Sequence, residues 1–296
     1  MKRILLGAFA LVCIAGTALA APISLPTGVP LYFQFNNLEQ VDTSGLNGIV
    51  VPGSYNGTNT QGNWGVMNVS SIQNGAISID HTNISGGPVF WQDDGPGGTQ
   101  GQIVGIFYGI NLTSGTTASG GILDLFWYNA GSDPVTAACL AGGCGPTAAT
   151  VAEFTGGTFL ARLDFTPGII NGDATTTVKS DIDLTGTING DGHANSFASV
   201  DLTDPGPWSN VLNGNWFFVD TNGNGIFGQT GITPTETPDL RFGNTFTLQP
   251  AWNGATGIKG FQSNDPARVY TAVPEPGTLV LLGLGLLGLG FCRRRK

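Results

Sequence analysis

The chain has 296 residues, of which 41% are hydrophobic and 10% are charged, and its formal net charge is −9 at neutral pH. The charged fraction is far below the roughly 25% of ordinary soluble domains, while the apolar fraction suffices for a packed core. Five basic and 19 acidic residues lie at positions 21–272, a net charge of −14. This argues against nucleic acid as a partner, because phosphate binding needs Lys and Arg.

The N-terminus has the pattern of a secretory signal. Lys2 and Arg3 precede a short apolar run, and a small-residue cleavage site ends at Ala20. We therefore expect residues 1–20 to be removed and residues 21–261 to fold as one exported domain.

Strand patterns dominate this domain. Short apolar or alternating segments, typical of buried and half-buried strands, occur at residues 31–35, 103–108, 122–127, 159–165, 178–184 and 240–248. Asn-Gly pairs, which favour tight hairpins, begin at positions 47, 56, 74, 189, 213 and 253. We expect no amphipathic helix between the two export segments. The pattern predicts an all-β fold, an antiparallel β-sandwich with jelly-roll-like connections.

Residues 131–158 are rich in Gly and Ala and are expected to form an insertion or loop. They contain Cys139 and Cys144, the two cysteines left after removal of the signal. An oxidising compartment favours their pairing, and the small loop thus closed would contribute ~2 kcal/mol to stability. A zinc site would need about four ligands, and no further Cys or His lies near these two in sequence.

A stretch that begins at Asp220 fits the front half of a calcium loop, D-x-[DN]-x-[DN]-G. The side chains of Asp220, Asn222 and Asn224 would supply oxygen ligands, as would the carbonyl of Ile226. Position twelve is Gly231, where a bidentate Glu is expected. A simple turn after the strand over residues 216–219 is the alternative to a calcium site.

Aromatic residues give a second candidate for binding. Trp91 and Trp208 lie in segments expected to be exposed, where their rings could stack on sugars; packing in the core is the alternative. The sequence has neither a G-x-S-x-G elbow nor an H-E-x-x-H helix. We therefore expect no enzymatic activity.

The C-terminal part has four successive features. Residues 262–272 are expected to form an exposed stalk, and a Val-Pro-Glu-Pro motif follows at residues 273–276. The 13 apolar residues Leu279–Phe291 come next, and as a helix they would rise about 20 Å, less than the roughly 30 Å hydrocarbon core. The basic cluster after them should stay cytoplasmic. The tail predicts a short, marginal transmembrane helix; a plain anchor is the alternative.

This tail resembles the PEP-CTERM sorting signal of Gram-negative bacteria, in which the same motif precedes a short helix and an arginine cluster. The residues that carry the resemblance are Val273, Pro274, Glu275, Pro276, Arg293, Arg294 and Arg295. It implies processing by exosortase, a membrane protease-transpeptidase, after transient contact with the inner membrane, and delivery to the cell surface or extracellular matrix. It covers only residues 273–296 and implies an address rather than an activity.

The leading hypothesis is a noncatalytic matrix protein that adheres to exopolysaccharide in a biofilm or floc, with calcium bridging its acidic surface. This is similar to the role proposed for the flocculation-associated subgroup of PEP-CTERM proteins. A carbohydrate-binding or carbohydrate-active β-sandwich enzyme is one alternative, and a self-assembling surface protein is another.

Overall fold

The computed structural model describes residues 23–79, 83–132, 134–136, 138–185, 191–223 and 235–272. The predicted signal peptide and the predicted sorting tail lie outside this part of the chain. Within it, no helix has both the length and the apolar character needed to cross a membrane.

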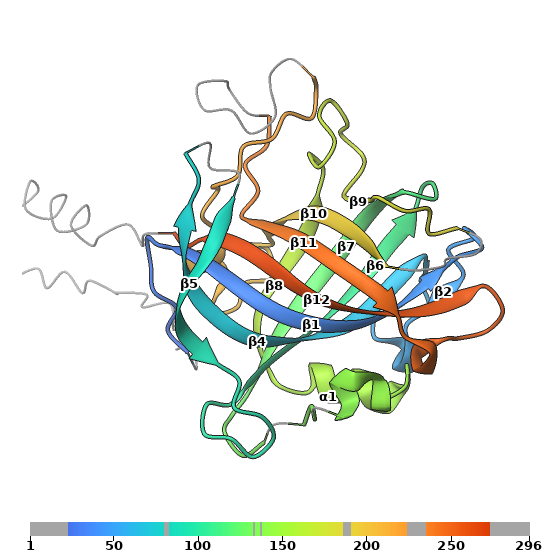
Figure 1. The fold of residues 1–296 in the computed structure, drawn as a ribbon, viewed down its shortest axis with the longest axis horizontal. Helices are drawn as coiled ribbons and strands as arrows, with labels where there is room; N and C mark the ends of the chain where they lie inside the picture. Colours follow the sequence, from blue (N-terminus) through green and yellow to red (C-terminus); the bar gives the residue numbers. More distant parts are fainter. Residues whose placement is uncertain are drawn as a thin grey trace, which may run out of the picture.

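Eight antiparallel strands form a closed sheet around the core (Figure 1). They are β1 (Pro30–Asp42), β4 (Asn63–Ile77), β6 (Gln102–Leu112), β7 (Thr117–Tyr128), β8 (Thr158–Thr166), β10 (Gly192–Val200), β11 (Leu240–Leu248) and β12 (Ile258–Tyr270). Each pairs with the next in this order, and β1 closes the ring by pairing with both β4 and β12. We call these eight strands the ring.

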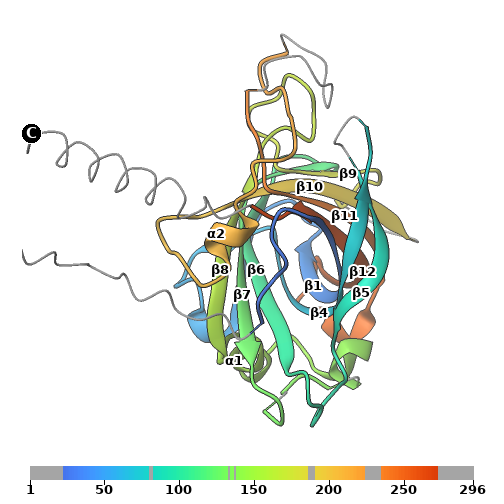
Figure 2. The ribbon, with the colours of Figure 1, turned by 90° about the vertical axis from the view of Figure 1, so that its left-hand side faces the viewer.

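Smaller elements decorate the ring. The strands among them are β2 (Ile49–Val50), β3 (Thr60–Gln61), β5 (Ile84–Gln92) and β9 (Val178–Ser180), and the helices and turns are η1 (Pro52–Ser54), η2 (Cys139–Gly143), α1 (Ala148–Thr155), α2 (Ser209–Leu212) and η3 (Pro250–Trp252). β5 extends the sheet from β4, and β9 pairs with β10 and β7. Figure 2 shows β6, β7 and β8 on one side of the interior and β1, β11 and β12 on the other.

The all-β, antiparallel class expected from the sequence is confirmed. The two layers expected of a sandwich are joined at both edges, because β1 pairs along its whole length with β12 and, through most of it, with β4. The jelly-roll-like connections are replaced by an up-and-down order in which ring strands that follow one another in the chain are neighbours. Short connections between neighbouring antiparallel strands favour this order.

The period of two along β1 sorts its side chains into two clusters. Leu31, Phe33, Phe35 and Val41 belong to a buried cluster inside the ring. Leu38 belongs to a second cluster, formed with residues of η2, α1 and η3 on the outside of the sheet. The ring is therefore apolar within and is also covered by packed segments over part of its outer surface.

Two sequence predictions about connecting segments are wrong. Residues 262–270 do not form an exposed stalk but continue β12, whose Ala267 and Val269 are buried. Residues 131–158 include a helix, α1, where none was expected. Thr147 begins it by accepting a hydrogen bond from the Thr150 N–H at 3.2 Å, and its buried residues pack against the outer face of the sheet.

Candidate functional site

The predicted calcium stretch begins at a buried turn. Asp220 is 2% exposed, and its Oδ1 accepts hydrogen bonds from the backbone N–H groups of Asn222, at 3.1 Å, and Gly223, at 3.0 Å. Asn224 and Ile226 lie outside the described residues. In the described part of the chain no group of three or more His, Cys, Asp or Glu residues is placed to hold a metal. Calcium binding here stays a prediction.

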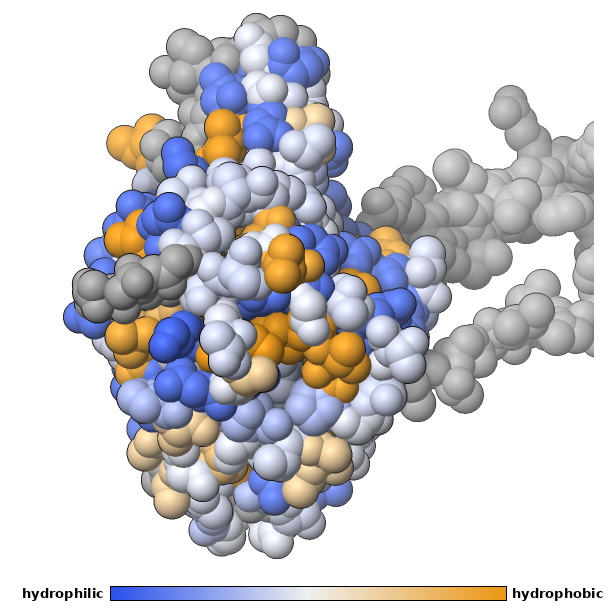
Figure 3. Space-filling model, turned by 90° about the vertical axis from the view of Figure 1, so that its right-hand side faces the viewer, coloured by the Kyte–Doolittle hydropathy of each residue, from blue (hydrophilic) through white to orange (hydrophobic). Residues whose placement is uncertain are grey.

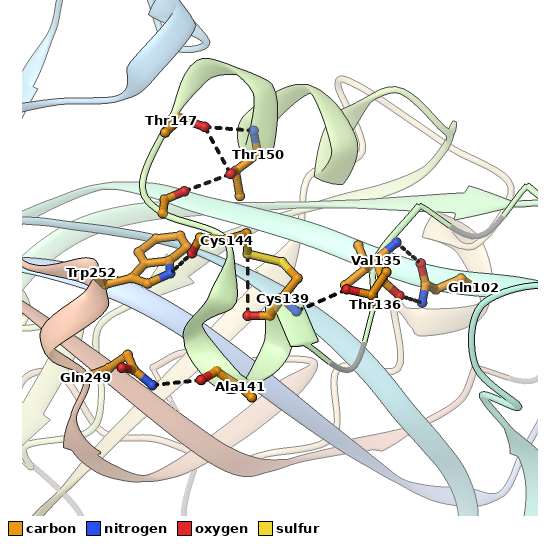
Figure 4. The surroundings of a disulfide bond; sticks show 11 residues. Gln102, Val135, Thr136, Cys139, Ala141, Cys144, Thr147, Thr150, Gln249 and Trp252 are labelled. Atoms are coloured by element: carbon orange, nitrogen blue, oxygen red, sulfur yellow. Dashed lines mark hydrogen bonds between the residues drawn. A yellow bond between two sulfur atoms is a disulfide. The ribbon is translucent and has the colours of Figure 1, made fainter.

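Cys139 and Cys144 are joined by a disulfide bond (Figure 4). The loop between them is fastened to η3: Trp252 Nε1 donates to the Cys144 carbonyl at 2.5 Å, and Gln249 Nε2 donates to the Ala141 carbonyl at 3.3 Å. These contacts join the disulfide loop to a segment more than one hundred residues later in the chain. The bridge is thus part of the cover over the outer face of the ring.

The two tryptophans expected to be exposed are buried. Trp208 is 1% exposed and Trp91 is 6% exposed. Trp208 Nε1 donates to the Ile23 carbonyl at 3.0 Å, and the ring of Trp91 packs 6.4 Å from that of Trp127. The prediction of exposed sugar-stacking rings at these positions is wrong, because both side chains belong to the main buried apolar cluster.

An uncharged polar groove crosses the outer surface of β1, β11 and β12, beside the disulfide loop. Its amide and hydroxyl side chains are Asn36, Thr245, Thr247, Gln249, Gln262 and Asn264. Leu140 and Ala141 complete the lining together with Asn37 and Ser263, whose side chains are buried. Within it, Gln249 Nε2 donates to Gln262 Oε1 at 2.8 Å. None of the lining side chains is ionisable. We call this the polar groove.

A second feature, missed in the sequence, is a cavity of about 80 Å³ inside the ring, lined by residues of all eight strands. The lining on β1 runs from Phe35 to Val41, so the cavity occupies the half of the ring in which β1 ends and β12 begins. Figure 3 views this end, where apolar side chains (orange) are visible between polar ones. Six of the lining residues are phenylalanines: Phe35, Phe107, Phe165, Phe242, Phe246 and Phe261.

Glu39 is the one ionisable side chain that the structure places in the lining of this cavity. It lies opposite Gly65 of β4 and Phe261 of β12. Asn63 Nδ2 donates to its Oε2 at 2.8 Å. Burial raises the pKa of Glu39 to about 7, and the hydrogen bond from Asn63 opposes this rise. The sequence held a clue, since Glu39 is in phase with the inward-facing Phe35 and Val41.

Other polar groups of the cavity have no partner. Asn37 is 2% exposed, and neither its Nδ2 nor its Oδ1 makes a hydrogen bond in the described structure. The same holds for Asn244 Oδ1. Unpaired buried amides are rare and costly. The cavity thus combines an apolar wall with a carboxyl group and unpaired amide groups.

The comparisons with known proteins concern the end of the chain. Residues 272–296 match the PEP-CTERM protein-sorting motif. This protein carries that sorting signal. The PEP-CTERM motif begins two residues after β12 ends at Tyr270. Comparisons with curated proteins and with solved structures gave no match.

The PEP-CTERM signal defines the route of the protein. Such signals are recognised by exosortase, so the protein is an exosortase-sorted surface protein that is exported across the inner membrane. The motif residues Val273, Glu275 and Arg293 lie outside the described part, as does the rest of the motif after Ala272.

Proposed function

We propose that this PEP-CTERM protein is a noncatalytic adhesin that binds neutral exopolysaccharide through its polar groove. The observation that supports this is the composition of the groove: six accessible amide or hydroxyl side chains and no charge. Amides both donate and accept hydrogen bonds, as sugar hydroxyls do. A neutral glycan could therefore exchange its water contacts for protein contacts without desolvating an ion.

The distribution of charge supports a neutral ligand. Residues 21–272 have a net charge of −14, which would repel acidic glycans at low salt. The groove itself lacks both acids and bases among its lining residues. Flocculation would follow if many surface copies held the same polymer strands, since linked weak sites gain avidity.

The test uses the exported, processed protein and neutral and acidic glycans on an array. We expect Thr247→Lys, in the groove, to reduce binding of neutral glycans at least tenfold. Thr158→Lys is the matched control, because Thr158 is an exposed threonine on β8, which is not a neighbour of β1, β11 or β12 in the ring. Equal binding by both variants, or normal flocs after deletion of the gene, would count against adhesion through this groove.

One observation favours self-assembly as a second candidate. β5 ends the order of strands in the sheet, and its residues Ser85–Phe90 are exposed, with Val89 53% and Phe90 42% exposed. An exposed apolar edge strand is a template for pairing with another chain. Light scattering with and without calcium would test this role. Val89→Lys should lower any self-association, whereas Leu202→Lys, at another exposed apolar residue, should not.

A further inference from the structure

The cavity inside the ring has the composition of a binding site. A closed sheet of eight strands has an interior just wide enough for side chains or for one small ligand. Here small residues leave part of that interior empty: Ala118, Ala194 and Ser196 line the cavity beside the phenylalanines. Gly65 permits close packing, because a Cβ there would lie 2.4 Å from Phe107 and 2.7 Å from Glu39.

The carboxyl group of Glu39 lacks a cationic partner. No Lys, Arg or His lines the cavity in the described structure. The polar side chain that contacts the Glu39 carboxyl group is the uncharged amide of Asn63, which donates a hydrogen bond to it. An ionised carboxylate in an apolar site is costly unless it is paired. A ligand that brings a positive charge would supply the missing counter-ion.

The aromatic wall favours the same ligand. Six phenylalanine rings surround the space, and the face of an aromatic ring attracts an ammonium group within about 6 Å. The unpaired amide of Asn37 and the unpaired Oδ1 of Asn244 add acceptors for N–H groups. A primary ammonium has three donors to distribute among such acceptors, as does the ammonium of lysine.

We propose that this cavity binds a small alkylamine, with its ammonium group paired to Glu39 and its alkyl group among the phenylalanines. The volume of about 80 Å³ limits the ligand to a few carbon atoms, since a cavity of about 150 Å³ holds benzene. This site is separate from the polar groove: it lies on the inner face of the sheet and takes a cation instead of a neutral sugar.

The experiment is calorimetric titration of the exported, processed protein with isobutylamine and with isobutanol, a neutral molecule of the same shape. We expect isobutylamine to bind with a Kd of about 1 mM or tighter and isobutanol to bind at least tenfold more weakly. Because the amine needs an ionised Glu39 with a pKa of about 7, its affinity should rise about thirtyfold from pH 5.5 to pH 8.

Two variants decide the assignment. Glu39→Gln keeps the shape of the side chain and should abolish the preference for the amine. Ala194→Leu fills the cavity and should remove binding of both probes. Glu153→Gln, at an exposed acid on α1, is the control and should bind as the unmodified protein does. Equal binding of amine and alcohol, an unchanged preference in Glu39→Gln, or no saturable binding of either probe (a cavity that holds water only) would overturn the proposal.

Discussion

Arg162 on β8 lies opposite Asp124 on β7, and its guanidinium donates to both oxygens of that carboxylate, at 2.7 Å and 2.9 Å. Asp124 is fully buried. The hydroxyl groups of Tyr55 and Tyr108 also donate to its Oδ2, at 2.9 Å and 3.1 Å. Tyr55 follows η1, so this carboxylate joins two neighbouring strands to the segment that covers them.

Removal of the arginine should therefore destabilise the fold strongly. Arg162→Met leaves a buried carboxylate without its counter-ion, and we expect a loss of about 3 kcal/mol in the free energy of unfolding. Urea denaturation measures this. Lys179→Met, at an exposed residue of β9, is the control and should change stability by less than about 0.5 kcal/mol. A similar loss in both variants would contradict the role of the pair.

Glu39 should make stability depend on pH. Burial raises its pKa from 4.5 to about 7 in the folded protein. Between these two pH values the folded protein therefore keeps a proton on Glu39 that the unfolded chain has already released. Glu39 is partly exposed, so solvent screening limits the resulting stabilisation to at most about 3 kcal/mol. It is complete below about pH 4.5 and is lost as the pH rises through 7. Glu39→Gln should therefore gain stability relative to the unmodified protein between pH 4.5 and 8.

Urea denaturation of Glu39→Gln and of the unmodified protein at pH 4, 5.5 and 8 tests this. The readout is the difference between their free energies of unfolding, because other carboxyl groups titrate in both proteins and cancel. The control Glu153→Gln should give a difference that does not change with pH in this way. A constant difference for Glu39→Gln as well would show that Glu39 ionises as freely as an exposed acid.

The disulfide should contribute a modest, local stabilisation. Its loop is short, so replacement of Cys139 and Cys144 by alanine should cost about 2 kcal/mol and lower Tm by about 4–8 °C. Amide exchange should increase in residues 138–155, which the loop and α1 occupy, and not in the ring. Reductant should lower the Tm of the unmodified protein alone; an equal effect on the double-alanine variant would contradict this account.

Calcium should stabilise the protein if the turn at Asp220 continues into a loop that binds the ion. With a Kd in the range typical of weak extracellular sites, 10 mM calcium should raise Tm by about 5 °C. Asn224→Ala should remove this shift, whereas Asn59→Ala, at an exposed residue between η1 and β3, should keep it. An identical shift in both variants would place the ion elsewhere.

The sorting motif should control processing. Replacement of Pro274, Glu275 and Pro276 by alanine should leave the unprocessed protein in the inner membrane, because exosortase recognises this signal. Cell fractionation and mass spectrometry of the C-terminus measure the outcome. Thr278→Ala lies just after the motif and should be processed normally. Normal surface display of the triple variant would show that another signal directs export.

The local strands were predictable from the sequence, and their closure was not. The alternation in residues 31–35 correctly predicted β1, because one of its faces packs on a continuous apolar interior. The part of β12 from residue 262 onward is not predictable as a strand, because Ser263 and Pro266 interrupt its apolar alternation. Its partner β1 lies more than two hundred residues away in the chain, and no local pattern encodes such a pairing.

The cavity was hidden for a related reason. The residues of β10 that face the interior, Ala194, Ser196 and Ala198, are small. At these positions β10 therefore lacks the large apolar side chains that make β7 recognisable as a strand. Small side chains at these positions make sense only when the phenylalanines that face them across the interior are known. The groove was equally invisible, since its amides come from three strands that the sequence does not bring together.

The pairing of Pro30 with Tyr270 has a consequence for biogenesis. β12 is the last of the ring strands in the chain, so the pairing with β1 that closes the ring, and separates its interior from solvent, must await the synthesis of the other seven. Six residues separate Ala272 from Leu279 in the sequence, and the seven Cα–Cα steps between the two can reach at most about 25 Å. Because the described chain leaves the ring beside Pro30, the sorting signal follows the end of the ring opposite the Phe-lined cavity.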